Sequence, residues 1–272
     1  MKNLNELKKI FKDKKILITG HTGFKGAWLT SIFDLMDVQI YGVSKDYPNN
    51  FFKKCKFKNL KEKKFDLSDY NKTKKLILNF KPDYIFHLAA QAIVSKSYTH
   101  PLETWKSNFL SFLNILETLR FVKKKTNVVM ITSDKCYLNV EKKTGYKEEE
   151  RLGGFENYSA SKASCEILFT SYFKSHFQKQ NKIKLATGRA GNVIGGGDWS
   201  NNRLVPDIIK SINNNKILSV RSLKSTRPWQ HVLEPLSGYI NLAINLNLNK
   251  KISGESFNFG PKTRNYTVEE VL

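Results

Sequence analysis

Short apolar runs alternate with amphipathic stretches along almost the whole chain, which predicts strands and helices in regular alternation. Strands are expected at the apolar runs, at residues 15–19, 39–43, 64–67, 84–88, 128–131, 184–190, 217–220 and 256–259. Helices are expected at residues 27–36, 69–80, 102–122, 158–176, 205–212 and 237–246, with another opening at Thr267. This alternation predicts an α/β fold with a Rossmann-type doubly wound parallel sheet.

A glycine-rich loop follows the first expected strand. It reads T-G-H-T-G-F-K-G over residues 19–26, with glycines at Gly20, Gly23 and Gly26. Glycines let backbone amides approach a pyrophosphate, and the start of the following helix adds a favourable dipole. A glycine loop between a strand and a helix, in that order, predicts a dinucleotide site.

The end of the second expected strand should meet the adenosine ribose of such a nucleotide. Sites for NAD usually place an acid there, whereas this strand ends in Ser44, Lys45 and Asp46. Ser44 and Lys45 would tolerate the 2′-phosphate of NADP, and Asp46 comes slightly late for the ribose. The pattern therefore leaves the choice between NAD and NADP open.

Positions at later strand ends are candidates for the same nucleotide. Asp66 can accept a hydrogen bond from the adenine amino group, or it can instead cap the helix that follows. Ala89 and Ala90 are small enough for a cofactor to approach closely. His87 is expected to be a core histidine, and Asn108, on the long helix, a buried polar anchor.

A hydroxyl, a carboxylate and an amine follow the apolar run at 128–131, as Ser133, Asp134 and Lys135. Open α/β sheets bind ligands at the carboxyl ends of strands, although Ser-Asp is also ordinary turn chemistry. Tyr158 and Lys162 share one face of an expected helix, and the lysine should lower the tyrosine pKa from ~10 towards use as a base. Together these residues predict a dehydrogenase type of active site.

The net charge of +22 comes mostly from lysine spread along the chain. Such a charge can indicate a nucleic-acid partner, but no helix-turn-helix, RNA-binding signature or zinc spacing accompanies it, so none is expected. No run approaches the ~18 apolar residues of a membrane span, and no signal-peptide core is visible at the start. Three cysteines without a C-x-x-C motif predict no disulfide framework and no metal site, and favour a reducing, cytoplasmic compartment.

Longer motifs give the chain a family resemblance. They are G-H-T-G-F-K-G-A-W-L (20–29), H-L-A-A-Q (87–91), T-S-D-K-C-Y (132–137), Y-S-A-S-K (158–162), R-A-G-N-V-I-G-G-G-D-W (189–199), R-L-V-P-D (203–207) and R-P-W-Q-H-V-L-E-P-L-S-G-Y (227–239). In this order they resemble the extended short-chain dehydrogenase/reductases, and among those most closely the CDP-glucose 4,6-dehydratases. Family members usually run some tens of residues further, so we expect the substrate-binding part to be C-terminally incomplete.

The resemblance implies an NAD-binding Rossmann domain at 1–190 and a smaller C-terminal substrate-binding region at 191–272, with segments that return to the first domain. It implies NAD contacts from Gly20, Thr22, Gly23, Phe24, Lys25, Gly26, Asp66, Leu67, Ala89, Ala90, Gln91, Asn108, Tyr158 and Lys162. It implies substrate contacts from Asn192, Arg203, Leu204, Arg227, Gln230 and His231. Arg221 and Arg227 near Trp229 suit phosphate and base recognition, or are surface charge.

The implied reaction converts CDP-glucose into CDP-4-keto-6-deoxyglucose, in deoxysugar and O-antigen biosynthesis. Tyr158, supported by Lys162, would deprotonate the C4 hydroxyl while Ser133 hydrogen-bonds the same oxygen. Asp134 would be the acid for the C6 hydroxyl, and Lys135 the base at C5. That base must be neutral, which requires burial or a nearby cation such as Lys162, because a free lysine has a pKa of ~10.4.

Two other functions and an assembly are also implied. A sugar-nucleotide 4-epimerase shares the serine, tyrosine and lysine but has no need of Asp134 and Lys135. A non-catalytic nucleotide-binding protein is the third possibility. Family members usually form homodimers through two long helices, here expected near 102–122 and 158–176.

Overall fold

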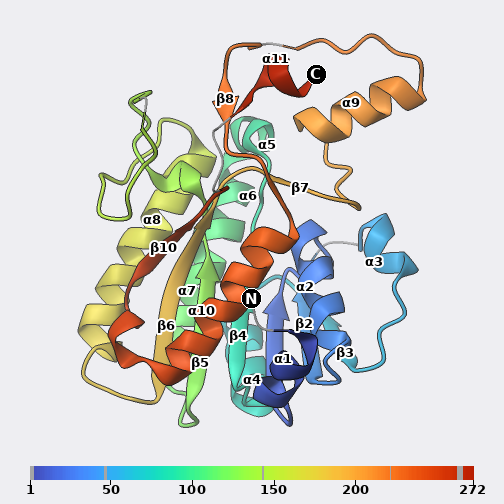
Figure 1. The fold of residues 1–272 in the computed structure, drawn as a ribbon. Helices are drawn as coiled ribbons and strands as arrows, with labels where there is room; N and C mark the ends of the chain where they lie inside the picture. Colours follow the sequence, from blue (N-terminus) through green and yellow to red (C-terminus); the bar gives the residue numbers. More distant parts are fainter. Residues whose placement is uncertain (1–2, 46–47, 143, 221, 262–265) are drawn as a thin grey trace.

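A seven-stranded parallel sheet runs through the centre of the molecule, in the order β10-β6-β5-β4-β1-β2-β3 (Figure 1). The computed structural model describes residues 3–45, 48–142, 144–220, 222–261 and 266–272. The strands are β1 Lys15–Thr19, β2 Gln39–Ser44, β3 Leu60–Lys64, β4 Tyr84–His87, β5 Thr126–Ile131, β6 Ile183–Ala190 and β10 Ser256–Phe259. The strand order reverses between β1 and β4, which confirms the predicted doubly wound Rossmann-type sheet.

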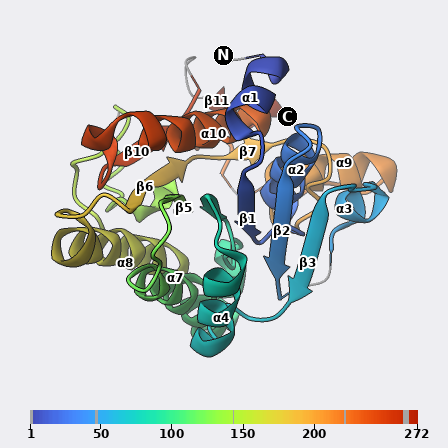
Figure 2. The same cartoon turned by 90° about the horizontal axis from the view of Figure 1, so that it is seen from below.

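Helices cover both faces of this sheet (Figure 2). One face carries α1 Leu4–Phe11, α2 Phe24–Asp34 and α10 Leu233–Leu248, and the other carries α4 Tyr70–Phe80, α7 Ser111–Leu119 and α8 Asn157–Tyr172. Alternate residues of β1 point to opposite faces, since Ile16 and Ile18 join the core under α2 and Leu17 joins the core under α7. Burial on both faces explains why the central strands are continuous apolar runs.

The two long predicted helices are present, and each contains a π-helical stretch. The first consists of α6 Pro101–Trp105, the π-helical η1 Lys106–Leu110 and α7. The second consists of α8 and the π-helical η3 Phe173–Phe177. The stretch in the first helix contains Asn108, and π-helical turns of this kind are frequent at functional sites.

Shorter elements lie at the carboxyl edge of the sheet or beside its ends. They are α3 Asn50–Lys54, α5 Val94–Thr99, η2 Asp134–Cys136, β7 Val193–Ile194, α9 Leu204–Asn213, β8 Thr226–Arg227, β9 Gln230–His231, η4 Lys250–Ile252, β11 Tyr266–Thr267 and α11 Val268–Val271. From the 191–272 region, α10 packs against the sheet and β10 pairs with β6. The division into two domains at residue 190 stays a prediction.

Two predicted strands are wrong. The third strand lies at Leu60–Lys64 instead of 64–67, because an edge strand needs no apolar core face and its residues after Leu60 are exposed. Residues 217–220 form no strand, and Ile217 is 100% exposed. Their apolar character therefore does not reflect pairing in the sheet.

Nothing in the part of the chain that the structure describes is both long and apolar enough to be a membrane-spanning helix. The same residues contain no group of three or more histidine, cysteine or acidic side chains that could hold a metal ion.

Candidate functional site

The glycine loop forms a narrow cradle between β1 and α2. Gly20 has a φ of +69°, and a Cβ atom added to Gly26 would lie 2.0 Å from the Gly20 carbonyl oxygen. Gly23 caps α2, which begins at Phe24, earlier than predicted. The first-turn amides of α2 are therefore available to an anion, and these residues fit the pyrophosphate of a dinucleotide.

Thr19 ties the ends of β1 and β4 together at the point where the strand order reverses. Its hydroxyl accepts a hydrogen bond from the Ala89 amide at 3.2 Å and lies 2.8 Å from Nδ1 of His87. A Cβ atom on Gly20 would lie 2.8 Å from the Ala89 backbone, so the two loops are in contact. Burial lowers the pKa of His87 to about 3, and the imidazole is a neutral core group, as expected.

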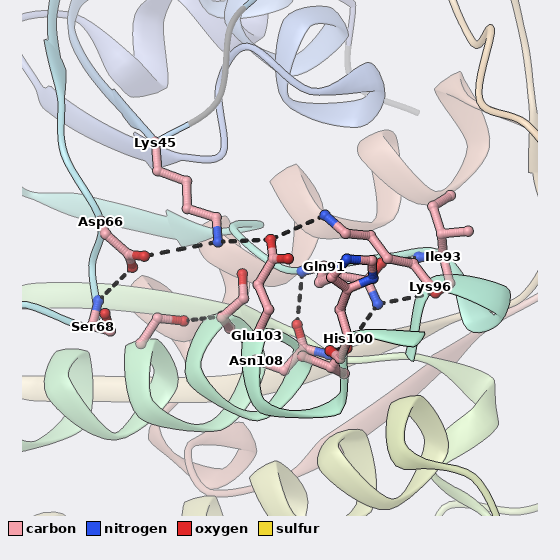
Figure 3. A network of polar contacts seen from close by, with 12 residues as sticks. Lys45, Asp66, Ser68, Gln91, Ile93, Lys96, His100, Glu103 and Asn108 are labelled. Carbon is pink, nitrogen blue, oxygen red and sulfur yellow. Dashed lines mark hydrogen bonds and ion pairs between the residues drawn. The ribbon is translucent and has the colours of Figure 1, made fainter. Parts of the chain in front are cut away.

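The end of β2 carries a network of charges, shown in Figure 3. Lys45 Nζ lies 3.8 Å from Asp66 Oδ2 and 3.5 Å from Glu103 Oε1, and Lys96 Nζ lies 3.0 Å from the same glutamate oxygen. Lys45 is thus held between two carboxylates. Their charge favours a ribose hydroxyl over a 2′-phosphate at this position, which supports NAD over NADP.

Neighbouring residues fix the backbone at the same end. Thr22 donates a 2.7 Å hydrogen bond to Ser44, and Asp66 accepts one from the Ser68 amide at 2.9 Å. Asp66 therefore closes a local turn, while α4 is capped by Asp69. The buried Leu67 offers its carbonyl to Asn114. Asp46 lies outside the described residues.

Asn108 is a buried polar anchor, as predicted. Its side chain is 2% exposed, accepts a hydrogen bond from the Gln91 amide at 2.8 Å and donates one to Ser161 at 2.9 Å. The Gln91 side chain is itself held by Ile93 and Thr104 (Figure 3). Asn108 thus joins the loop after β4, which contains Ala90, to the helix that carries Tyr158 and Lys162.

Asp134 and Lys135 of the triplet after β5 lie in a short 3₁₀ turn, η2, which Ser133 caps. The Ser133 hydroxyl donates to Asp134 at 3.0 Å, and Ser133 lowers the pKa of the Tyr158 phenol. Burial raises the pKa of the Asp134 carboxyl, against the opposing effect of Lys135. Lys135 itself is exposed, so burial, one of the two conditions expected for a neutral base, is not met in this structure.

The pKa of Tyr158 is raised, not lowered as expected. Burial raises the pKa of Tyr158 to about 12, and the charge of Asp134 raises it further, while Ser133 and Arg203 lower it. Burial also lowers the pKa of Lys162. The free-energy cost of removing the phenolate from water exceeds the stabilisation that the neighbouring protein groups provide.

A second lysine stands at the same site. Burial and the charges of Lys162 and Arg203 lower the pKa of Lys25 to about 8, and Asp134 opposes them. Lys25 is in the first turn of α2, directly after the glycine loop. The structure therefore brings a candidate cofactor residue, a candidate substrate residue and Asp134 of the candidate catalytic triplet into one electrostatic cluster.

The expected substrate residues differ in their surroundings. Arg203 pairs with Asp198 at 2.7 Å and influences Tyr158, and Leu204 begins α9. The Asn192 carbonyl accepts from the Gln230 amide at 3.0 Å, and the Gln230 side chain donates to the Phe259 carbonyl. These two residues therefore support the loop after β6.

The remaining expected substrate residues lie nearer the surface. His231 makes an edge contact with Trp28, at 6.3 Å between ring centroids. Arg227 is exposed and donates to the Thr226 carbonyl. Arg221 lies outside the described residues.

Three groups at or beneath the site have no counterpart in the sequence-based expectations. Glu103 holds Lys45, Tyr239 lies beside Lys25, and Glu166 binds Arg189 beneath the triplet. Glu166 follows Lys162 by one more helical step on the Tyr158 face, so helical spacing could have indicated it. Tyr239 ends the 227–239 motif, which predicted no role for it, and no local pattern marks Glu103.

Comparison with known proteins found a matching family model and curated relatives. A model described as "NAD dependent epimerase/dehydratase family" matches residues 16–260. CDP-glucose 4,6-dehydratase of Salmonella typhimurium is 41% identical, over 97% of this chain and 76% of that protein. dTDP-D-glucose 4,6-dehydratase of Dictyostelium discoideum is 28% identical, over 91% of this chain and 58% of that protein.

Solved structures show the same fold. Epimerase Mth375 from Methanothermobacter thermautotrophicus superposes with a TM-score of 0.86 and 20% identity, covering 98% of this chain and 77% of that one. DesIV, a dTDP-glucose 4,6-dehydratase from Streptomyces venezuelae, gives a TM-score of 0.82 and 18% identity, covering 94% and 78%. At these identities the likeness concerns the fold alone.

Proposed function

Because this chain belongs to the NAD dependent epimerase/dehydratase family, we propose that it converts CDP-glucose into CDP-4-keto-6-deoxyglucose with bound NAD, in deoxysugar biosynthesis. The observation that carries the proposal is the position of Ser133, which donates a hydrogen bond to Asp134 and lowers the pKa of the Tyr158 phenol. Ser133 and Tyr158 are the pair that oxidation at C4 requires, and Asp134 is the carboxyl that dehydration requires. Ser133 joins the two. The 41% identity to a CDP-glucose 4,6-dehydratase supports the same substrate.

The residues divide the proton transfers among them. The glycine loop would hold bound NAD, which would supply a hydride acceptor for C4 of the sugar and a hydride donor for C6. Tyr158 takes the proton of the C4 hydroxyl, and Ser133 hydrogen-bonds that oxygen. Lys162, on the same helix face, provides positive charge near the phenolate.

Water then leaves across C5 and C6. Asp134, whose pKa is raised by burial, is the acid that donates a proton to the departing C6 hydroxyl. Lys135 removes the proton from C5, which the C4 ketone has made acidic, and returns it to C5 afterwards. The proton that Tyr158 took from the C4 hydroxyl restores Asp134, so the net change is the loss of one water molecule.

A product assay with CDP-, UDP-, GDP- and dTDP-glucose, each with NAD and with NADP, tests the proposal. We expect a 4-keto product, which absorbs in alkali, from CDP-glucose with NAD. Formation of a 4-epimer instead would identify an epimerase that uses Ser133, Tyr158 and Lys162 alone. Binding of NAD without any product would identify a non-catalytic protein.

We also propose a cytoplasmic homodimer. Among the described residues all cysteines are free thiols, which supports a reducing compartment. Ile167 on α8 is 59% exposed, and Phe121, just after α7, is 45% exposed. A pairing through these two long helices would cover both side chains, and sedimentation of the purified chain tests it.

A further inference from the structure

Glu103 forms ion pairs with two lysines beside the expected cofactor site. Its Oε1 atom lies 3.0 Å from Lys96 Nζ and 3.5 Å from Lys45 Nζ, and Lys45 Nζ lies 3.8 Å from Asp66 Oδ2 (Figure 3). The hydrogen bond from Lys96 lowers the pKa of Glu103, so the glutamate is charged at neutral pH. Two cations and two anions therefore form one cluster without net charge.

The cluster lies next to the glycine loop. Lys45 directly follows β2 and Asp66 follows β3, while Glu103 lies on α6, beyond the end of β4. Because β1 lies between β2 and β4 in the sheet, the contact of Lys45 with Glu103 joins segments on either side of β1. The Gly20 amide donates to the Val43 carbonyl at 2.7 Å, which holds the glycine loop against the end of β2. The adenosine ribose of a dinucleotide whose pyrophosphate rests on this loop should therefore meet Lys45.

A ligand can reach these side chains. The exposed fractions are 22% for Lys45, 37% for Glu103 and 42% for Asp66. A ribose hydroxyl can donate a hydrogen bond to a carboxylate, which is only an acceptor when ionised. A 2′-phosphate brings between one and two further negative charges, about −1.5 to −2, to a lysine that already has two carboxylate partners. Repulsion by these carboxylates therefore acts against NADP and not against NAD.

We propose that Glu103 determines the preference for NAD over NADP, by holding Lys45 and Lys96 in ion pairs. The usual determinant is an acid at the end of the second strand, where this chain has Ser44 and Lys45. Glu103 supplies negative charge to the same place from a helix 58 residues further along the chain. Without this charge, both lysines would be available to a 2′-phosphate. The inference rests on the proposed function only in requiring that the chain binds a dinucleotide.

Glu103→Gln tests the inference because it removes one charge and keeps the size of the side chain. Affinities of the full, cofactor-free chain for NAD⁺ and NADP⁺ would be measured by calorimetry at low ionic strength, where screening is weak. We expect the ratio of NADP⁺ affinity to NAD⁺ affinity to rise about tenfold, the effect of one charged hydrogen bond gained. Structural damage to the site would weaken both cofactors and leave this ratio unchanged.

Two further variants separate the local effect from the change in total charge. Glu117→Gln is the matched control, because it removes the same charge from α7, where Glu117 pairs with Arg120 at 2.8 Å. It should leave the ratio unchanged. The double variant Glu103→Gln/Lys45→Met should lose most of the gain, because the lysine is the group that would bind the 2′-phosphate.

Several results would overturn the role of Glu103. These are an unchanged ratio in Glu103→Gln, an equal rise in Glu117→Gln, the full gain in the double variant, and a wild-type chain that prefers NADP⁺. The first three leave the proposed function intact, since the wild-type chain still binds NAD⁺. A wild-type chain that binds neither dinucleotide would instead sink the proposed function together with this inference.

Discussion

Glu166 and Arg189 form an ion pair beneath the triplet Ser133–Lys135, with 2.7 Å between Oε2 and Nη2 and side chains only 1% and 4% exposed. The carboxylate also accepts hydrogen bonds from Thr132, from Thr187 at 2.9 Å and from Ser256 at 3.0 Å. Thr132 directly precedes the triplet. One carboxylate on α8 therefore holds the ends of β5, β6 and β10 together.

Glu166→Ala should strongly destabilise the fold, because it leaves the Arg189 charge buried without a partner. We expect the free energy of unfolding to fall by about 3–5 kcal/mol, measured by urea denaturation. Glu117→Ala is the control, since the Glu117–Arg120 pair is more exposed and its loss should cost less than about 1 kcal/mol. A loss as small as that of the control would show that Arg189 finds other partners.

Gly26→Ala should weaken NAD binding by about tenfold or more. The added methyl group would lie 2.0 Å from the Gly20 carbonyl oxygen, so the cradle must widen. Gly196→Ala is the matched control, because nothing lies within 4 Å of its added Cβ atom. Calorimetric titration of both variants checks this, and equal affinities would contradict the role of the cradle.

Tyr158→Phe should reduce kcat by about 10²–10⁴-fold, the usual contribution of a positioned acid or base. Affinity for NAD should change little, since the helix and Lys162 remain. Steady-state kinetics together with NAD titration separate the two effects. A variant that lost NAD binding in proportion to kcat would indicate a binding role for Tyr158 instead.

Lys135→Ala should keep NAD binding but lose dehydration, if Lys135 is the base at C5. Its side chain is exposed, so the substitution should leave the folded structure intact. Deuterium uptake at C5 from heavy water reports the proton transfer directly. Uptake at the wild-type rate would assign that step to another group.

His87 should make stability depend on pH. Its pKa is about 3 in the folded chain and about 6.5 when unfolded. Between these values the unfolded chain binds a proton that the folded chain does not, so the free energy of unfolding falls as the pH falls. From pH 7 to 5 this amounts to roughly 1–2 kcal/mol.

Denaturation of wild type and His87→Asn at both pH values checks this expectation. The variant should lose less stability on acidification. The exposed His100 provides the control, as His100→Asn should follow the wild type. A His87→Asn variant with the wild-type pH dependence would show that other groups cause the acid sensitivity.

The local pattern of apolar residues was sufficient to predict the central strands, because burial on both faces of the sheet requires continuous apolar runs. It failed at β3, whose exposed charges give no such run, and at Ile217, which is apolar but fully exposed. The glycine loop and the Tyr158–Lys162 pair were recognisable because their function depends on spacing within one segment.

Properties that depend on distant segments were not recognisable. The pKa of Tyr158 is set by burial, which local spacing does not reveal. The partners of Lys45 and Glu166 come from helices and strands far along the chain. Such contacts follow from the fold and not from a motif.

Ser256 opens β10, the last strand of the sheet in sequence, and donates to Glu166. During synthesis, β6 emerges long before this partner exists. At about 5–20 residues per second, the interval lasts on the order of several seconds, during which the edge of β6 opposite β5 has no partner strand. The hydrogen bonding of Glu166 beneath the triplet is therefore completed late in translation. Ribosomal pausing before residue 256 would prolong the exposure of an aggregation-prone strand edge.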